Sequence, residues 1–333
     1  MIRIRRAVAL SMVSALVLLS FSGSGCEVAR SLLAPPSPTA TATGTPTPTA
    51  TPTITATPTP TFTPTPTIEP LRLSVNLHPT QVGQGHTLWI ELLANRGIAA
   101  TGVFEGRLLS FEQVTGGAWA VIGVSVRTEP GAHAIQLSIA DGAGANVTIT
   151  VPVMVEATAF ASEQIYIPPD RMGLLDPAVT EEEAQRLDQV FAVVTSQQLW
   201  QGTFVWPHVG RVTSGFGTSR LYNDGHDSYH GGMDIAGDTG APVVAANRGT
   251  VALAGPLNVH GNAVVIDHGW GVFSAYYHLS EVLVNEGQQV GQGEIVGRVG
   301  NTGLSTGAHL HWEMRVGGVQ VDPVEWTTRP IPG

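Results

Sequence analysis

Two histidines separated by a single residue, His309 and His311, are the side chains of this chain best placed to do chemistry. Side chains alternate between the two faces of a β-strand, so both imidazoles would face one site if this segment is a strand. Upstream, His230 and Asp234 offer a further imidazole and a carboxylate four residues apart. Two imidazoles and a carboxylate can hold Zn²⁺ and leave another histidine free for proton transfer, which is the minimum for metal-assisted hydrolysis.

Each of these short motifs is weak evidence when it stands alone. The chain has 11 histidines, so a single pair can arise by chance, and Asp234 could simply cap a turn after Gly231 and Gly232. Another histidine, His278, follows two tyrosines and could be a packed core residue. The motifs gain weight because all of them fall in one glycine-rich segment with strand-like runs.

The segment from 201 to 333 has the pattern of an all-β domain with tight turns. Runs rich in β-branched and aromatic residues predict strands at 243–246, 249–253, 262–267 and 272–277. We expect no helix of useful length in this part of the chain. The strands must therefore position the histidines and the aspartate.

The first 26 residues have the features of a secretory signal. Three arginines precede an apolar run at 7–21, and small residues follow it. The run is short for a membrane span, which needs about 20 residues, although an uncleaved anchor is the alternative. Cys26 is the only cysteine, so no intrachain disulfide can form. The pair Gly25–Cys26 resembles the end of a bacterial lipobox, which implies lipid attachment at Cys26 and a membrane tether.

The next two regions differ sharply in composition. Residues 27–70 are dominated by proline and threonine and predict a disordered linker with extended geometry. At about 3.1 Å per residue, about 35 such residues could reach on the order of 100 Å. Residues 71–157 instead contain short apolar or alternating runs between Gly, Asn and Pro, which predict a small Ig-like β-sandwich.

A connector at 158–200 is predicted to contain one helix. Thr180 and Glu183 have the spacing of a capping box, and apolar residues from Leu187 onward recur at helical spacing. We therefore expect a helix over 181–197 that packs against a neighbouring domain.

The charge of the chain bears on its partners. The formal net charge is −10, and all 16 basic residues are arginines without any basic run. Such a balance does not suit nucleic acid. It agrees with a soluble body outside the cytoplasm.

Four fragments of the C-terminal segment together resemble the lysostaphin-type zinc metallopeptidases, also called the glycyl-glycine endopeptidase family. They occur in family order: Ser214-Gly215-Phe216-Gly217, His230-Gly231-Gly232-Met233-Asp234, Tyr277-His278-Leu279-Ser280 and Gly307-Ala308-His309-Leu310-His311. The resemblance covers residues 205–326. It implies a mainly β chain, with a C-terminal all-β metallopeptidase domain of antiparallel sheets after the small sandwich and the connecting helix.

The resemblance also implies a role for each residue that matches a family motif. His230, Asp234 and His311 would bind one Zn²⁺ per chain. His309 would be the general base, and His278 would donate a hydrogen bond to the developing oxyanion.

The implied reaction is hydrolysis of peptide bonds in cross-links or stem peptides of bacterial peptidoglycan. Peptidoglycan would be the partner, nucleic acid would not, and a lipid at Cys26 could join the protein to a membrane. The export signal and the linker agree with a location in the cell envelope. The sandwich could be a spacer, a wall-binding module or a plug over the groove.

Several residues near the motifs receive no role. Arg220, Tyr222 and Tyr229 are expected to line the groove, while His226, His260 and His268 are treated as loop or outer residues.

Two other functions remain to be weighed. Some family members lose zinc ligands and act as silent regulators or activators of other cell-wall hydrolases. The full set of ligands and auxiliary histidines favours an enzyme instead. The run at 286–296 resembles a biotinyl or lipoyl carrier module, but such carriers attach their cofactor through lysine, and this chain has none.

Overall fold

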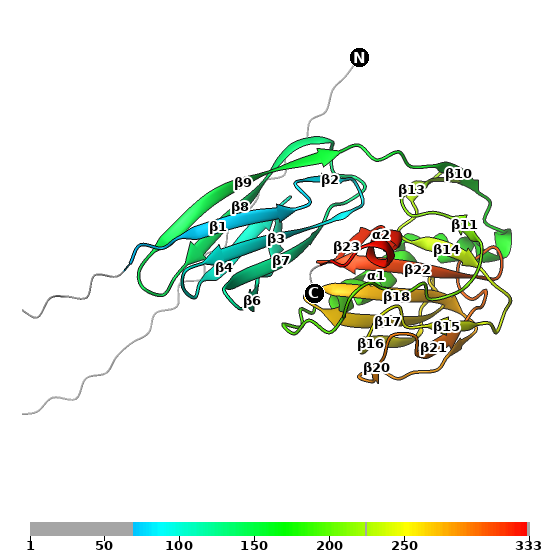
Figure 1. Cartoon of the computed structure of the whole chain (residues 1–333). Helices are drawn as coiled ribbons and strands as arrows, with labels where there is room; N and C mark the ends of the chain where they lie inside the picture. The colour runs from blue at the N-terminus through cyan, green and yellow to red at the C-terminus, as the bar shows by residue number, and fades with distance from the viewer. Residues whose placement is uncertain (1–68, 224, 332–333) are drawn as a thin grey trace, which may run out of the picture. The chain divides into compact units, whose positions relative to one another are not determined.

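The computed structural model describes residues 69–223 and 225–331, which are mainly β (Figure 1). Most of the strand pairs are antiparallel, so the predicted fold class is confirmed. The export signal, Cys26 and nearly all of the proline- and threonine-rich region lie outside the described residues. Within the described part, no helix has the length and apolar character needed to cross a membrane.

Two sheets between residues 73 and 156 enclose one apolar core. The first has the order β1-β3-β7-β6 and the second β2-β9-β8-β4-β5. The strands are β1 (Leu73–His78), β2 (Gln81–Gly83), β3 (Thr87–Ala94), β4 (Ala99–Phe104), β5 (Arg107–Leu109), β6 (Glu112–Val114), β7 (Gly117–Gly123), β8 (Gly131–Ala140) and β9 (Asn146–Glu156). Leu88, Ile90 and Leu92 of β3 alternate into this core and are fully buried, as the period of a half-buried strand requires.

The connector contains β10 (Ser162–Ile165), the 3₁₀ helix η1 (Pro169–Leu175) and α1 (Pro177–Phe191). The helix predicted over 181–197 is therefore wrong at both ends. It begins four residues earlier because the Asp176 side chain accepts a hydrogen bond from the backbone N–H of Ala178, which follows a proline at the first helical position. Thr180 is not the cap, since its hydroxyl bonds back to the carbonyl of Pro177.

The C-terminal part is built on a sheet with the strand order β11-β14-β22-β18-β17-β16-β20, and β23 pairs with β22 (Figure 1). Smaller sheets have the orders β15-β21-β19 and β10-β12-β13. The strands are β11 (Val212–Ser214), β12 (Ser219–Tyr222), β13 (Asp227–Tyr229), β14 (Met233–Ala236), β15 (Pro242–Val244), β16 (Gly249–Pro256), β17 (Asn262–Gly269), β18 (Val272–Leu279), β19 (Glu281–Val282), β20 (Gln289–Val290), β21 (Ile295–Arg298), β22 (His309–Val316) and β23 (Val319–Val321). One short helix, α2 (Pro323–Thr328), follows them.

The sandwich and the C-terminal sheets share apolar contacts and backbone hydrogen bonds. Val121 of β7 belongs to the same core cluster as Val316 and Val321. The carboxylate of Glu325 accepts a hydrogen bond from the backbone N–H of Thr87 at 2.8 Å. The sandwich is thus packed against the sheet that carries β22.

A buried chain of hydrogen bonds runs through the C-terminal core. The backbone N–H of Ala246 donates to the Tyr276 hydroxyl at 2.7 Å, and that hydroxyl lies 2.7 Å from the Ser274 hydroxyl. Ser274 in turn lies 2.7 Å from Nε2 of His268, while Nδ1 of His268 donates to the carbonyl of Arg248 at 2.8 Å. His268 is therefore a core residue whose two nitrogens are both satisfied.

This buried histidine makes the core sensitive to acid. Burial lowers the pKa of His268 to about 4, although its bond to the Arg248 carbonyl opposes the shift. An unfolded histidine binds a proton near pH 6.5, so between pH 6.5 and 4 the unfolded state holds more protons than the folded state. We expect His268 to lower the free energy of unfolding by up to about 3 kcal/mol as the pH falls through this range.

Urea unfolding of wild type and His268→Gln at pH 7, 5.5 and 4.5 measures this contribution. The variant should be less stable at pH 7 and lose less stability on acidification. Parallel pH profiles for the two proteins would show that His268 does not have this role.

Candidate metal centre

The register of β14 and β22 brings Asp234 and His311 together. In this antiparallel pair Asp234 lies directly opposite His311, and Ala236 lies opposite His309. Directly opposed residues have Cβ atoms about 4.5–5.5 Å apart, so their side chains meet when they share a face. The fully buried Leu310 lies between the two histidines along β22. The predicted strand geometry of the histidine pair is therefore present.

His230 reaches the same point from the turn before β14. The second of the two glycines that follow it, Gly232, has a steric purpose, because the backbone of β22 passes very close. A Cβ atom on Gly232 would lie 2.4 Å from the carbonyl oxygen of Trp312 and 3.0 Å from Nε2 of His311. A side chain at this position would therefore push the turn away from β22.

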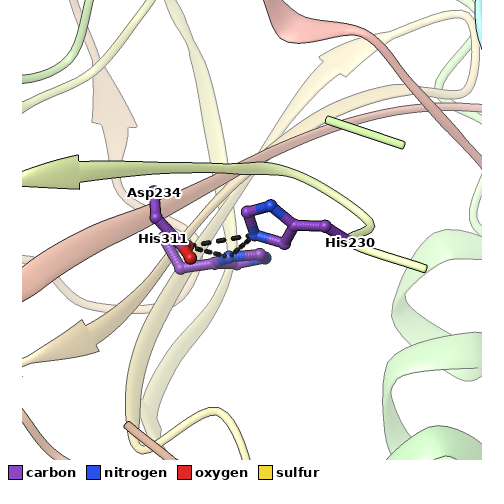
Figure 2. A group of neighbouring side chains, drawn as sticks. All are labelled: His230, Asp234 and His311. Carbon is purple, nitrogen blue, oxygen red and sulfur yellow. Dashed lines mark hydrogen bonds and ion pairs between the residues drawn. The ribbon is translucent and has the colours of Figure 1, made fainter. Parts of the chain in front are cut away.

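His230, Asp234 and His311 converge on a common point (Figure 2). Nε2 of His230 lies 3.0 Å from Oδ1 of Asp234 and 2.9 Å from Nδ1 of His311. The remaining distance, between Nδ1 of His311 and Oδ1 of Asp234, is 2.7 Å. The sequence predicted this convergence, although His230 and His311 are 81 positions apart in the chain.

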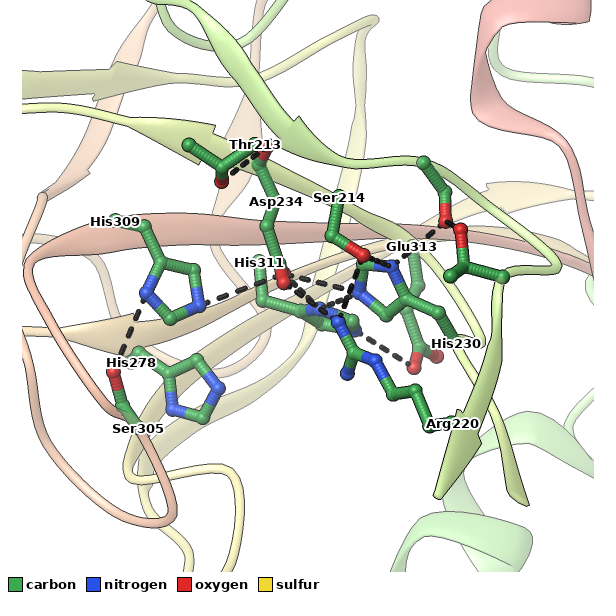
Figure 3. Close-up of polar contacts among 12 residues, drawn as sticks. Thr213, Ser214, Arg220, His230, Asp234, His278, Ser305, His309, His311 and Glu313 are labelled. Atoms are coloured by element: carbon green, nitrogen blue, oxygen red, sulfur yellow. Dashed lines mark hydrogen bonds and ion pairs between the residues drawn. The ribbon is translucent and has the colours of Figure 1, made fainter. Parts of the chain in front are cut away.

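Hydrogen bonds on the outer side of each group determine which atom faces the centre (Figure 3). Nδ1 of His230 donates to the carbonyl of Gly215 at 2.9 Å, which leaves the Nε2 lone pair directed inward. Nε2 of His311 lies 3.2 Å from the Glu313 carboxylate and donates to it, so Nδ1 faces the centre. Arg220 donates to Oδ2 of Asp234 at 2.9 Å, which leaves Oδ1 for the site.

The three groups fit a zinc ion. Two imidazole nitrogens and one carboxylate oxygen are a common ligand set of catalytic zinc, and three protein ligands leave a position open. Hydrogen bonds from ligands to surrounding carboxylates and carbonyls are typical of metal-binding histidines. Here these hydrogen bonds leave the lone pairs of all three ligands directed toward one point. A cation at that point would relieve the repulsion between the lone pairs.

Two carboxylates flank this point, and each is paired with an arginine: Asp234 with Arg220 and Glu313 with Arg315. Burial alone raises the pKa of Asp234, but its close contacts with the imidazoles of His230, His309 and His311 outweigh it and hold that pKa well below its usual range. Burial lowers the pKa of His311, but Asp234 and Glu313 outweigh it and raise that pKa to about 9. Two carboxylates that hold a proton on His311 also favour a divalent cation.

His309 and His278 lie next to the three candidate ligands (Figure 3). Nδ1 of His309 donates to the carbonyl of Gly307 at 2.8 Å, and Nε2 lies 3.5 Å from Oδ1 of Asp234. The rings of His309 and His278 have their centroids 5.0 Å apart. In a neutral His309, the Nε2 lone pair therefore faces the centre, as a base requires.

His278 differs from the prediction. Its Nδ1 donates to the carbonyl of Thr302 at 2.8 Å. Burial, together with the positive charge of His311, lowers the pKa of His278 well below its usual value. A neutral imidazole has one N–H, so Nε2 of His278 is an acceptor. This hydrogen bonding does not fit the predicted donor to an oxyanion.

These histidines line a cavity of about 230 Å³. Other residues that contribute to its wall are Ile165, Ile167, Arg220, Tyr222, Tyr229 and His260. Arg220 and the tyrosines lie just before His230 in the sequence, which made their presence expected. The isoleucines come from the connector and carry no sequence signal for a site, because they are ordinary apolar residues outside every motif.

The comparison with known families agrees with this geometry. Residues 228–323 match the family described as Peptidase family M23. The C-terminal region belongs to peptidase family M23. The resemblance to the lysostaphin-type zinc metallopeptidases is thereby confirmed, and the match contains all five residues discussed above as ligands or auxiliary histidines.

Individual relatives extend the comparison. The "Outer membrane antigenic lipoprotein B" of Haemophilus influenzae is 30% identical over 206 residues, which are 62% of this chain and 46% of that protein. The "Peptidoglycan DD-endopeptidase ShyA" of Vibrio cholerae is 39% identical over 116 residues, 34% of this chain and 27% of that protein. A crystal structure described as a putative peptidase M23 from Pseudomonas aeruginosa is 25% identical with a TM-score of 0.48, and the match covers 71% of this chain and 94% of that one. The chain thus spans less than half the length of these two curated relatives.

Removal of a candidate ligand should remove the metal. We expect Asp234→Ala to lose zinc from the purified protein, because two histidines alone hold it weakly. Elemental analysis of the protein after dialysis measures the zinc content. Asp238→Ala, which removes an exposed carboxylate from the same segment, is the matched control and should keep its metal. Equal zinc in both variants would contradict the assignment.

Arg220 should support metal binding without touching the metal. Its guanidinium holds Oδ2 of Asp234, and loss of such a partner typically weakens metal affinity about 10- to 100-fold. Competition with a chromogenic chelator would measure the affinity of Arg220→Ala. Arg211→Ala, an exposed arginine of the same region, is the control. Identical affinities would show that Arg220 does not orient Asp234.

Proposed function

We propose that this protein is a zinc-dependent endopeptidase that hydrolyses peptide bonds in the cross-links or stem peptides of peptidoglycan. The observation that carries the proposal is the convergence of His230, Asp234 and His311 beside two further histidines, inside a domain of a peptidase family. A silent regulator, the alternative from the sequence, would not need a complete set of these groups.

In this proposal His230, Asp234 and His311 hold one zinc ion per chain. Zinc in such a site supplies Lewis-acid chemistry, which activates water and polarises a carbonyl. Glu313 and Arg220 keep the ligands in the orientation that binding requires.

His309 carries the proton transfer. Because its Nδ1–H is bound to the carbonyl of Gly307, Nε2 is free to take a proton from the attacking water and return it to the leaving amine. His278 presents a second acceptor beside it and is placed to hold that water for His309. This assignment replaces the oxyanion-donor role for His278.

The substrate and location are inferred from the relatives and from the N-terminal sequence. ShyA is named for its action on peptidoglycan, and the Haemophilus protein is named as an outer membrane lipoprotein. An export signal that ends at Cys26 agrees with a protein of the cell envelope, joined to a membrane by a lipid on that cysteine. The proline- and threonine-rich linker would let the domain reach the wall.

A single substitution separates metal binding from catalysis. We expect His309→Ala to keep its zinc and lose peptide hydrolysis by at least about 100-fold, the usual contribution of a general base. Digestion of isolated peptidoglycan, followed by separation of the released peptides, measures the rate. His208→Ala, a histidine of the same domain outside the cavity wall, is the control. Digestion by His309→Ala at the wild-type rate would overturn the proposed base.

A further inference from the structure

One histidine of the cavity wall has no part in the proposed mechanism. His260 lies in the loop between β16 and β17, and its ring lies against that of Tyr277 with centroids 4.3 Å apart and planes tilted by 43°. The ring is 6.4 Å from that of His311, and the side chain is 26% exposed. It is therefore close to the metal centre and accessible to a bound peptide.

A carboxylate from outside the family match holds this loop. Glu183 lies on α1, is 4% exposed and accepts three hydrogen bonds. The donors are the backbone N–H of Val259 at 2.7 Å, the backbone N–H of His260 at 3.1 Å and Nδ1 of His260 at 2.5 Å. Burial raises the pKa of Glu183, but His260 and the two backbone bonds outweigh it and lower that pKa. An ionised, buried carboxylate therefore fixes both the loop and the ring.

The bond to Glu183 also decides what His260 can do. Since Nδ1 donates to the carboxylate, a neutral ring presents the Nε2 lone pair. In the part of the chain that the structure describes, this nitrogen has no hydrogen-bond partner. A group on the cavity wall with an unused acceptor can bind an N–H donor.

His260 also contributes to the walls of two cavities. It lines the cavity at the metal centre and a second cavity of about 190 Å³, whose wall includes Glu183, Asp188 and Arg315. A peptide that extends from the metal centre toward the second cavity must pass the ring of His260.

We propose that His260 is a substrate-binding residue that accepts a hydrogen bond from an N–H donor of the bound peptide, and that Glu183 positions it. Helix α1 is then part of the peptidase site, although it lies outside the segment that matches the family. The inference rests on the proposed function for the nature of the substrate. The donor is a main-chain amide or a side-chain amine of the stem peptide.

The test measures binding apart from cleavage. Binding of a synthetic stem peptide with a free side-chain amine is followed by calorimetry in a His309→Ala background. His260→Phe keeps an aromatic ring against Tyr277 and leaves both backbone N–H groups bonded to Glu183. We expect it to weaken binding on the order of tenfold, as the loss of one hydrogen bond predicts, with unchanged zinc content.

Glu183→Gln should weaken binding to a similar extent, while Glu182→Gln, an exposed neighbour on α1, should not. Because Glu183 acts through His260, Glu183→Gln should add little to His260→Phe, and the two effects should not sum. In otherwise wild-type protein, His260→Phe should raise KM and leave kcat within about twofold. Wild-type affinity in His260→Phe, or fully additive effects of the two substitutions, would overturn the proposal.

A second peptide, with the amine trimethylated so that it keeps its charge and has no N–H, identifies the donor. If the amine is the donor, trimethylation weakens binding and His260→Phe has no further effect on the trimethylated peptide. If a main-chain amide is the donor, His260→Phe weakens binding of both peptides equally. A wild-type protein that binds the peptide through His260 but cleaves nothing would refute the proposed function and leave this inference intact.

Discussion

The site depends on the pairing of β14 with β22. A one-residue slip in the register would turn Asp234 or His311 to the opposite face of the sheet, so a single backbone alignment determines whether the centre exists. Tyr277 of β18 lies opposite His311 on its other side, so the ligand strand is held from both edges. Gly232 then allows the turn with His230 to approach this strand. The metal centre is thus a consequence of sheet geometry more than of loop conformation.

Groups outside the segment that matches the family complete the surroundings of the centre. Glu163 of β10 accepts a hydrogen bond from Arg220 at 2.7 Å, and Arg220 holds Asp234. Arg171 of η1 donates to carbonyls of the loop that precedes His309, including that of Gly303 at 3.0 Å. The connector therefore contacts two separate segments that contribute to the cavity wall, one at Arg220 and one before His309. The conformation of the connector therefore influences Arg220 and the loop before His309, which the sequence alone would assign to a domain that folds and acts by itself.

The sequence predicted the parts of the structure that depend on local chemistry. The strand alternation of His309 and His311 and the runs that became β16, β17 and β18 could be recognised because period and residue type are local properties. The predicted start was wrong because the Asp176 cap competes with the Thr180 capping box, and the predicted end was wrong because α1 ends at Phe191. The hydrogen bonds of His278 could not be predicted, since its partner Thr302 is 24 residues away and is placed by the fold.

The contact between β7 and the C-terminal core has a consequence for protein engineering. Val316 and Val319 pack beside Gly123, and Val121 lies in the same cluster. A shortened chain that begins after the sandwich would expose this apolar face to water, where such surface promotes self-association. The exposed face would include the far end of β22, the strand that begins with His309. Solubility and the integrity of β22 are therefore linked, and a shortened chain would need polar replacements on this face.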